Sequence, residues 1–438
     1  MSNLIKIKNK INSFNKTIAV PGDKSLSIRW VLFASMAQGN SKAFNLLLSE
    51  DVLASINAIK KLGINVKLNK TNCTIFGNGP DGYNYKKNII INAENSGTLG
   101  RLIMGILIDS PYEIKIIGDK SLSRRDFKRI AEPLNKFGAK IKLTKKGLPL
   151  TIKGNKNLHP IRYLEHKGSA QCKSSVIFAG LKTEGKTFIK AKKSRDHTEL
   201  LCKHLKLPIK VDKTKNYDLI EVSKAKKIKP LIYKIPSDIS SGAFFIVLTA
   251  LSDSSKLLIK NVNINPSRIG ILTILKKMGV NIKLKNKQKY KGEIIADIFV
   301  TSSKKLKAIN CPSKLNSGAI DEFLIIFLVA AKAKGVSYFK DIGELNQKES
   351  PRLKWGSKIL NKMGIKTITT GSSIKIFGNP NLKINKKVVI KGYLKDHRVF
   401  MTSVIAALAF GGSWDIHDKS SINTSFPTFL NIIDNLTK

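Results

Sequence analysis

The sequence predicts an α/β protein with two domains, each made of three similar units. Its length of 438 residues exceeds that of one ordinary domain. Six strongly apolar helical segments recur at intervals of roughly 70 to 80 residues, and a second pattern of lysine-rich helix, glycine and strand recurs between them. Because six such units are too many for one hydrophobic core, we expect two domains of three units with a cleft between them.

Each of the six apolar segments follows a polar turn rich in hydroxyl side chains. The segments are apolar on nearly every side, which is typical of helices buried inside a domain. The six helices are expected at residues 24–38, 97–108, 171–181, 238–251, 319–332 and 397–410.

The second repeated pattern places a glycine between an amphipathic helix and a strand with alternating apolar residues. Glycine has no Cβ and suits the left-handed conformation that ends many helices. Four segments share the pattern: "KKLGINVKL" (60–68), "NKFGAKIKL" (135–143), "KKMGVNIKL" (276–284) and "NKMGIKTIT" (361–369). The segment "KHLKLPIKV" (203–211) follows the same pattern without the glycine.

The chain is strongly basic, with 78 Lys and Arg against 30 Asp and Glu and a formal net charge of +48. A positive field of this kind favours partners that are anions, such as nucleic acid, an acidic membrane or anionic substrates. The lysines alternate with apolar residues rather than forming a block, and aromatic residues are only 7% of the chain, which favours solvated faces. A basic nucleic-acid-binding protein is the non-enzyme alternative.

The four cysteines indicate a reduced compartment and no metal site. Cys73, Cys172, Cys202 and Cys311 are far apart and form neither a C-x-x-C pair nor a Cys/His cluster. The N-terminus lacks the pattern of a secretory signal, and the apolar run 323–331 is short against the roughly 20 residues that span a bilayer. We therefore expect a cytoplasmic protein with no membrane partner.

The segment "PGDKSLSIR" (21–29) places cations and hydroxyls at the start of the first apolar helix. The first turn of a helix offers backbone N–H groups and the positive end of its dipole. Lys24, Ser25 and Arg29 could therefore bind a phosphate or carboxylate together. A capped helix with snorkelling cations is the competing interpretation.

Similar turns follow along the first half of the chain. In "NSGTLGR" (95–101), Gly97 permits close backbone approach, Thr98 presents a hydroxyl, and Arg101 follows one helical turn later. Three further strings add Arg124, Arg125, Ser169, Gln171, Lys173, Ser194, Arg195 and His197. The arginines outnumber what one anion needs, which indicates two anionic ligands.

The second half of the chain differs because its turns also carry carboxylates, which together with lysine supply the parts for general acid–base catalysis. For each carboxylate alone, a helix N-cap is the competing interpretation. For His397, a packing role and a proton-carrying role both remain open. The candidates are Asp238, Asp321, Glu322, Lys348, Glu349, Arg352, Asp396, His397 and Arg398.

Taken together, these strings resemble the 5-enolpyruvylshikimate-3-phosphate (EPSP) synthase family over essentially the whole chain. They are "PGDKSLSIR", "NSGTLGR", "GDKSLSRR", "SAQCKS", "SRDHTE", "DISSGAFF", "AIDE", "KES", "DHR" and "SFP". The resemblance implies the two-domain enolpyruvyl transferase fold, an inside-out α/β barrel with three βαβαββ units and buried helices in each domain. It also implies domains at 21–235 and at 1–20 plus 236–438, with the active site in the interdomain cleft.

The resemblance implies transfer of the enolpyruvyl group of phosphoenolpyruvate to the 5-hydroxyl of shikimate 3-phosphate, with release of phosphate. Shikimate 3-phosphate would be held by Lys24, Ser25, Arg29, Ser169, Gln171, Ser194, Asp321 and Lys348. Phosphoenolpyruvate would be held by Lys24, Gly97, Arg125, Gln171, Arg352 and Arg398. The same strings add Arg101, Ala170, Thr98 and His397.

For catalysis, we expect Asp321 to act as the base at the hydroxyl. Glu349, helped by Lys24 and Lys348, is expected to move protons at the methylene carbon. Closure of the two domains would exclude water. No cofactor or metal is expected, the chain is expected to be a monomer, and glyphosate should compete with phosphoenolpyruvate because Gly97 leaves room.

The closest enzyme alternative is UDP-N-acetylglucosamine enolpyruvyl transferase, whose fold and phosphoenolpyruvate chemistry are the same. Its reactive-cysteine loop is not evident around any of the four cysteines. The sequence also departs from the EPSP synthase pattern. Pro351 replaces a usual aspartate, and Thr424 stands where some members carry a phosphate-binding lysine.

Overall fold

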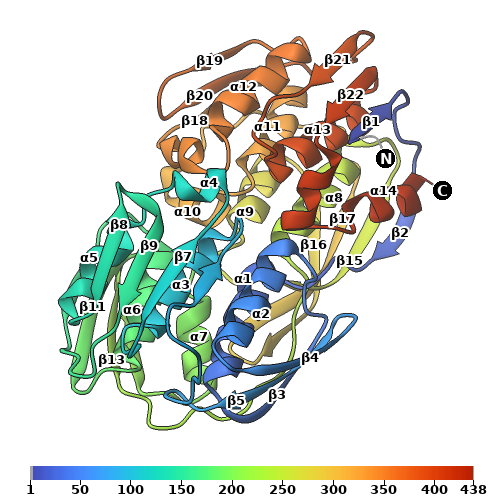
Figure 1. Ribbon diagram of the computed structural model, residues 1–438. Helices are drawn as coiled ribbons and strands as arrows, with labels where there is room; N and C mark the ends of the chain where they lie inside the picture. Colours follow the sequence, from blue (N-terminus) through green and yellow to red (C-terminus); the bar gives the residue numbers. More distant parts are fainter. Residues whose placement is uncertain (1–2, 438) are drawn as a thin grey trace. The chain divides into compact units, whose positions relative to one another are not determined.

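The structure, a computed structural model that describes residues 3–437, contains six small β-sheets with helices between them (Figure 1). The chain divides into two compact units. The central unit is Gly22–Ile235 together with Tyr290–Glu293, a segment that the predicted ranges assign to the other domain. The terminal unit contains the remaining described residues. Residues 1, 2 and 438 of the predicted ranges lie outside the described residues.

Three sheets of the central unit have the same strand arrangement, in which the first strand pairs in parallel and the other pairs are antiparallel. The first sheet is ordered β14 (Ile232–Lys234), β3 (Gln38–Phe44), β5 (Asn72–Asn78) and β4 (Asn65–Asn69). The second is β6 (Ile90–Asn92), β7 (Glu113–Ile117), β9 (Gly147–Lys153) and β8 (Lys140–Thr144). The third is β10 (Arg162–Glu165), β11 (Lys186–Lys192), β13 (Tyr217–Ser223) and β12 (Ile209–Lys213).

The sheets of the terminal unit are variants of that arrangement. One sheet is β16 (Asn281–Tyr290), β17 (Glu293–Thr301), β15 (Lys256–Asn263) and β2 (Asn15–Ile18). Another is β18 (Gly335–Phe339), β20 (Ile374–Gly378) and β19 (Thr367–Thr369). The last is β1 (Leu4–Ile7), β22 (Ser413–His417) and β21 (Lys387–Ile390), so strands from the two ends of the sequence lie side by side (Figure 1).

Each sheet accompanies one buried helix and one amphipathic helix, which confirms the predicted α/β class and its repeats. The buried helices are α1 (Lys24–Met36), α3 (Gly97–Ile106), α6 (Ala170–Gly180), α8 (Ile239–Leu251), α11 (Phe323–Lys332) and α13 (His397–Phe410). The amphipathic helices are α2 (Glu50–Lys61), α5 (Lys128–Lys136), α7 (His197–His204), α9 (Gly270–Lys277), α12 (Arg352–Lys362) and α14 (Phe429–Thr437). The buried helices belong to one large apolar cluster in each unit.

The glycines of the second pattern have the left-handed backbone that it predicts. Gly63, Gly138, Gly279 and Gly364 have φ between 85° and 108°. In the variant without glycine, Lys206 has a φ of 56°. A lysine therefore occupies the left-handed position there, at the conformational cost that an L side chain pays in this region.

The predicted helix at 319–332 is wrong in its first turn. The structure has a short helix α10 (Asn316–Ala319), a turn at 320–322, and then α11. The N–H of Glu322 donates to the carbonyl of Ala319 at 2.9 Å, and the carbonyl of Glu322 accepts from Ile326 at 3.0 Å. A helix therefore ends and another begins at this turn, which places Asp321 and Glu322 at a helix start.

Candidate active site

In the central unit, the first turn of α1 presents Lys24. The carboxylate of Asp23 caps the helix by accepting from the N–H of Leu26 at 2.9 Å. Lys24 Nζ lies 2.8 Å from Asp51 Oδ2, in the first turn of α2. The Lys24 side chain is 24% exposed, so it is partly accessible to a ligand.

Arg29 lies one turn along α1 and is held by hydroxyl groups. Its Nε donates to Thr198 Oγ1 at 2.8 Å, and its Nη2 donates to Ser174 Oγ at 3.2 Å. Its Nη1 donates to the carbonyl of Ser25 at 3.1 Å, which confirms that the two residues share a helix face. These acceptors fix the guanidinium without adding a negative charge beside it.

A second cluster joins the start of α3 to the start of α6. Gln171 connects the two helices, because its Oε1 accepts from Arg101 Nη1 and its Nε2 donates to Thr98 Oγ1 at 3.0 Å. Arg101 also stacks on Phe127, with its Cζ 5.1 Å from the ring centroid. Burial, followed by the neighbouring charge of Arg125, lowers the pKa of Arg101 to about 10. An arriving anion would relieve both effects.

Arg125 belongs to the same cluster and lies over Gly97. Its Nη2 donates to Asn95 Oδ1 at 2.9 Å, and Asn95 in turn donates to Asp119 at 2.6 Å. A Cβ on Gly97 would lie 3.1 Å from Nη1 of both Arg101 and Arg125. The absence of a side chain at Gly97 is therefore what lets two guanidinium groups approach this helix start.

The predicted serines of the central unit lie at turns. Ser169 caps α6 by accepting from Cys172, beside Ala170 at the first helical position. Because the Ser169 oxygen acts as the acceptor, its proton remains available for an anion. Ser194 Oγ is buried and has no hydrogen-bond partner among residues 3–437, which is consistent with a group that pairs with a ligand.

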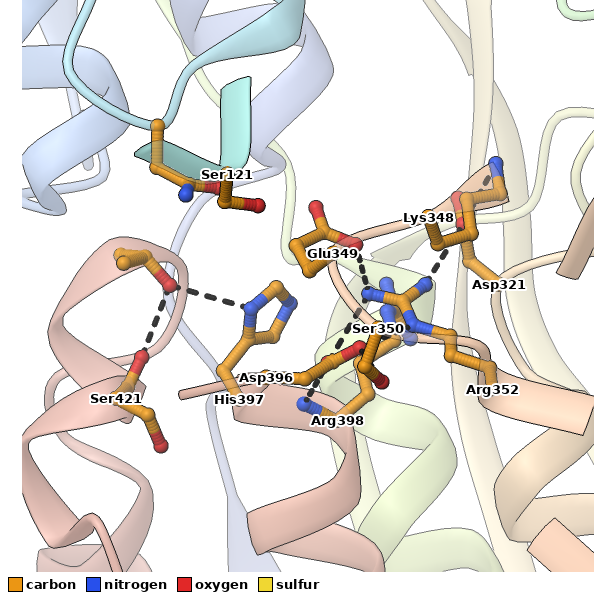
Figure 2. A network of polar contacts seen from close by, with 12 residues as sticks. Ser121, Asp321, Lys348, Glu349, Ser350, Arg352, Asp396, His397, Arg398 and Ser421 are labelled. Carbon is orange, nitrogen blue, oxygen red and sulfur yellow. Dashed lines mark hydrogen bonds and ion pairs between the residues drawn. The ribbon is translucent and has the colours of Figure 1, made fainter. Parts of the chain in front are cut away.

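In the terminal unit, Lys348 and Arg352 both lie against Asp321 (Figure 2). Lys348 Nζ and Arg352 Nη1 are each 3.4 Å from Asp321 Oδ1. The side chains of Lys348 and Asp321 are 25% and 16% exposed, whereas that of Arg352 is almost fully buried. The carboxylate and the lysine are therefore accessible, and the arginine anchors them.

Arg352 also contacts two further carboxylates. Its Nε donates to Asp396 Oδ2 at 2.9 Å, and its Nη2 donates to Glu349, as Figure 2 shows. Burial by itself lowers the pKa of Arg352, but Asp396 and Glu349 outweigh it and raise the pKa above its ordinary value. Burial likewise acts to raise the pKa of Asp396, but Arg352 holds that pKa below its ordinary value. Both groups are therefore charged at neutral pH.

The start of α13 presents His397 and Arg398. Asp396 caps this helix by accepting from the N–H of Arg398 at 2.9 Å. Arg398 Nη1 lies 3.6 Å from Glu322 Oε1. His397 is 4% exposed, and its Nδ1 lies 3.2 Å from Thr424 Oγ1. Thr424 thus serves as a partner of His397.

Two residues that the sequence suggested as anion ligands have other partners. Lys173 is fully buried and lies 2.6 Å from Glu199. The His197 Nδ1 lies 2.7 Å from Glu293 Oε1, with both side chains fully buried. Their positions in polar turns suggested anion binding wrongly, because the sequence pattern does not show whether a cationic side chain points toward the ligand or into the protein.

The N-cap alternative for the carboxylates is correct for Asp238 and Asp396, which cap α8 and α13. It is wrong for Asp321, which lies in a turn and pairs with cations, and Glu322 accepts no cap hydrogen bond. Asp51 is a site residue that the sequence reasoning missed. Its position in the first turn of the helix after α1 could have indicated this role. However, acidic residues are common in first turns because they interact favourably with the helix dipole.

Among residues 3–437, no group of three or more His, Cys, Asp or Glu side chains has an arrangement that could hold a metal ion. Within the same residues, no helix is long and apolar enough to cross a membrane. The clusters offer arginine, lysine and hydroxyl donors for anions in the central unit. In the terminal unit they offer carboxylates beside a lysine and two arginines, which suits proton transfer next to an anion.

The six sheets with their buried helices form the enolpyruvyl transferase fold. The structure aligns with the enolpyruvyl transferase NikO from Streptomyces tendae with a TM-score of 0.75 at 14% identity, covering 100% of this chain and 98% of that chain. Identity at this level supports the fold alone.

The chain belongs to the EPSP synthase (3-phosphoshikimate 1-carboxyvinyltransferase) family, whose sequence model matches residues 8–433. A 3-phosphoshikimate 1-carboxyvinyltransferase from Ruthia magnifica is 39% identical over 97% of this chain and 96% of the relative. One from Caldicellulosiruptor bescii is 38% identical over 98% of each chain. The solved EPSP synthase from Acinetobacter baumannii aligns with a TM-score of 0.87 at 34% identity, covering 99% of this chain and 98% of that chain.

Proposed function

We propose that this chain transfers the enolpyruvyl group of phosphoenolpyruvate to the 5-hydroxyl of shikimate 3-phosphate and releases phosphate. Family membership favours this reaction over the UDP-N-acetylglucosamine and nucleic-acid alternatives. The observation that carries the mechanism is the contact of two carboxylates, Asp321 and Glu349, with the same guanidinium of Arg352, next to Lys348.

Binding is assigned to cations and hydroxyls of both units. We assign the phosphate and ring hydroxyls of shikimate 3-phosphate to the α1 and α6 starts and to the Asp321 turn. The residues are Lys24, Ser25, Arg29, Ser169, Gln171, Ser194, Asp321 and Lys348. We assign phosphoenolpyruvate to Lys24, Gly97, Arg125, Gln171, Arg352 and Arg398, with Arg101, Thr98, Ala170 and His397 beside them. Clustered cations offset the mutual repulsion of two anions.

The chemistry requires two proton transfers before phosphate leaves. Asp321 accepts the proton of the 5-hydroxyl of shikimate 3-phosphate while the hydroxyl oxygen forms a bond to C2 of phosphoenolpyruvate. Glu349, helped by Lys24 and Lys348, delivers a proton to C3. The resulting tetrahedral adduct then loses a C3 proton to Glu349 and expels phosphate, which restores the double bond. The leaving phosphate takes up the proton that Asp321 had accepted. General acid–base groups of this kind contribute roughly 10² to 10⁴-fold.

A steady-state assay of phosphate release tests the proposal. Phosphoenolpyruvate is supplied with shikimate 3-phosphate, with UDP-N-acetylglucosamine, or without an acceptor. We expect phosphate release only with shikimate 3-phosphate, at rates that saturate in both substrates. Release with UDP-N-acetylglucosamine instead would overturn the assignment.

We also propose that the protein is a cytoplasmic monomer without a specific nucleic-acid partner. All four cysteines are free and buried, which suits a reducing compartment. The high net charge predicts only weak retention on nucleic acid that weakens steeply with salt, and a nanomolar complex at physiological salt would contradict it.

A further inference from the structure

Arg398 is held differently from the other arginines of the candidate site. Its guanidinium pairs with Glu322, and the 3.6 Å between Nη1 and Oε1 makes this an ion pair rather than a hydrogen bond. Within the described residues, no other side-chain partner is found for Arg398. The N–H donors of its guanidinium are therefore available to an anion. The direction in which the Arg398 side chain points depends on one carboxylate, that of Glu322.

Glu322 is fully buried, although it is a carboxylate. It lies at the start of α11, and its Oε1 accepts a short hydrogen bond from Ser240 Oγ at the start of α8. Its Oε2 is buried and has no hydrogen-bond partner among residues 3–437. A buried carboxylate with an unsatisfied oxygen is costly for stability, so its presence calls for a role other than stabilising the core.

Ser240 is in turn fixed by a second arginine. Arg268 Nη2 donates to Ser240 Oγ at 2.7 Å and lies 3.3 Å from Asp238 Oδ1, while the N–H of Ser240 donates to the same Asp238 oxygen at 2.8 Å. Arg268 is 2% exposed. The chain of contacts from Arg268 through Ser240 to Glu322 therefore links three segments of the terminal unit and ends at Arg398.

We propose that Glu322 is a positioning residue that aims the guanidinium of Arg398 at the anion it binds, and that Ser240 and Arg268 hold Glu322 in place. The inference rests on the proposed function, which assigns Arg398 to phosphoenolpyruvate. Glu322 touches neither substrate in this scheme. It acts by restricting the directions available to a long side chain, and it leaves all the N–H donors of that side chain for the ligand.

Glu322→Gln tests the proposal, because glutamine keeps the shape and can still accept from Ser240 but loses the charge that attracts Arg398. We expect the KM for phosphoenolpyruvate to rise about tenfold. The kcat should change less than about threefold, and the KM for shikimate 3-phosphate should not change. If Glu322 merely neutralised Arg398, its removal would strengthen anion binding and the KM for phosphoenolpyruvate would fall, which would overturn the proposal.

Ser240→Ala provides a second test that leaves every charge in place. We expect the KM for phosphoenolpyruvate to rise about threefold because Glu322 loses its hydrogen-bond donor, and an unchanged KM in both variants would overturn the proposal. Asp297→Asn is the matched control. It removes a buried carboxylate of the same unit that lies 2.8 Å from Lys260, so it should change thermal stability without changing either KM.

The wild-type enzyme separates this inference from the proposed function. If wild type fails to release phosphate from the two substrates, the proposed function is wrong. If wild type is active and Glu322→Gln has wild-type constants, the proposed function stands and the positioning role of Glu322 is wrong.

Discussion

The two units have similar repeats but hold the arginines of the candidate site in different ways. In the central unit, Arg29 is held by hydroxyls and Arg101 by an amide, so their charge is not cancelled by these partners. In the terminal unit, Arg352 touches three carboxylates and Arg398 lies against a fourth. A shared architecture thus carries two kinds of electrostatic environment.

This difference indicates a division of labour. Cations fixed by neutral groups present a permanent positive charge, which favours binding of anions in the ground state. An arriving anion raises the pKa of carboxylates that share a guanidinium. Such carboxylates can therefore exchange protons with a substrate. We therefore expect changes at the arginines of the central unit to alter KM, and changes at the carboxylates that contact Arg352 in the terminal unit to alter kcat.

The largest expected effect is that of Glu349→Gln in the terminal unit. The variant keeps the size of the side chain but cannot deliver a proton, so kcat should fall by roughly 10² to 10⁴-fold with smaller changes in KM. Steady-state phosphate release measures both constants. The control Glu344→Gln changes an exposed carboxylate five residues earlier and should behave like wild type. A Glu349→Gln variant with a normal kcat would remove Glu349 from the chemistry.

Asp396→Asn should have the largest effect on stability. Asparagine can still cap α13, but the buried pair with Arg352 is lost, at a cost on the order of 3 kcal/mol in the free energy of unfolding. Because Arg352 holds the pKa of Asp396 below its ordinary value, this contribution is fully present above about pH 4, the unfolded pKa, and is lost as the pH falls through the lower folded pKa.

Denaturant unfolding of both proteins across this pH range measures the difference. The wild type and Asp396→Asn should converge in stability at the acidic end. Asp253→Asn, which removes a pair with Lys10 whose aspartate is 77% exposed, should cost much less at every pH. A gap between wild type and Asp396→Asn that stays constant down to pH 2 would contradict the assigned ion pair.

Arg29→Lys should have a smaller effect, and on binding rather than on turnover. Lysine cannot reproduce the contacts with Thr198 and Ser174, and it presents one charged nitrogen instead of a fork. We expect the KM for shikimate 3-phosphate to rise about 10 to 100-fold with kcat within a few-fold. The control is Arg162→Lys on an exposed strand position. A variant that lost kcat alone would break the division of labour between the units.

Local signals made much of the fold predictable. Helix α13 begins at His397 and ends at Phe410, as predicted, because an aspartate cap and a glycine bound an apolar run. The break at 320–322 was not predictable, because two acidic residues before an apolar run are also typical of the first turn of a continuous helix. Asp321 in this turn forms ion pairs with Lys348 and Arg352, which lie in a later segment of the chain.

The sequence predicts which residues contribute to the candidate site better than it predicts which residues they contact. The strings at the helix starts contain the cations, whereas their partners lie elsewhere in the sequence. Thr198 is 169 residues from Arg29, and Asp51 is 27 residues from Lys24. Such pairs depend on how helices pack on one another, and no periodicity in a single sequence encodes which side chains meet.

The smallest expected effect comes from Gly97→Ala in the central unit. Its added Cβ would lie 3.1 Å from one nitrogen of Arg101 and of Arg125, so both guanidinium groups must shift by a few tenths of an ångström. We expect the KM for phosphoenolpyruvate to rise about fivefold, corresponding to roughly 1 kcal/mol, with kcat nearly unchanged. Because glyphosate should compete for the same arginines, its inhibitory concentration should rise as well. Steady-state rates at varied phosphoenolpyruvate and glyphosate measure both.

Gly371→Ala is the matched control, because a Cβ there has nothing within 4 Å and should alter neither constant. The two outcomes for Gly97→Ala distinguish two kinds of site. A rise in KM without loss of kcat supports a central unit that binds anions through arginines held by neutral partners. A fall in kcat at constant KM would mean that Arg101 and Arg125 act on the transition state, and the contrast with the terminal unit would then be one of composition alone.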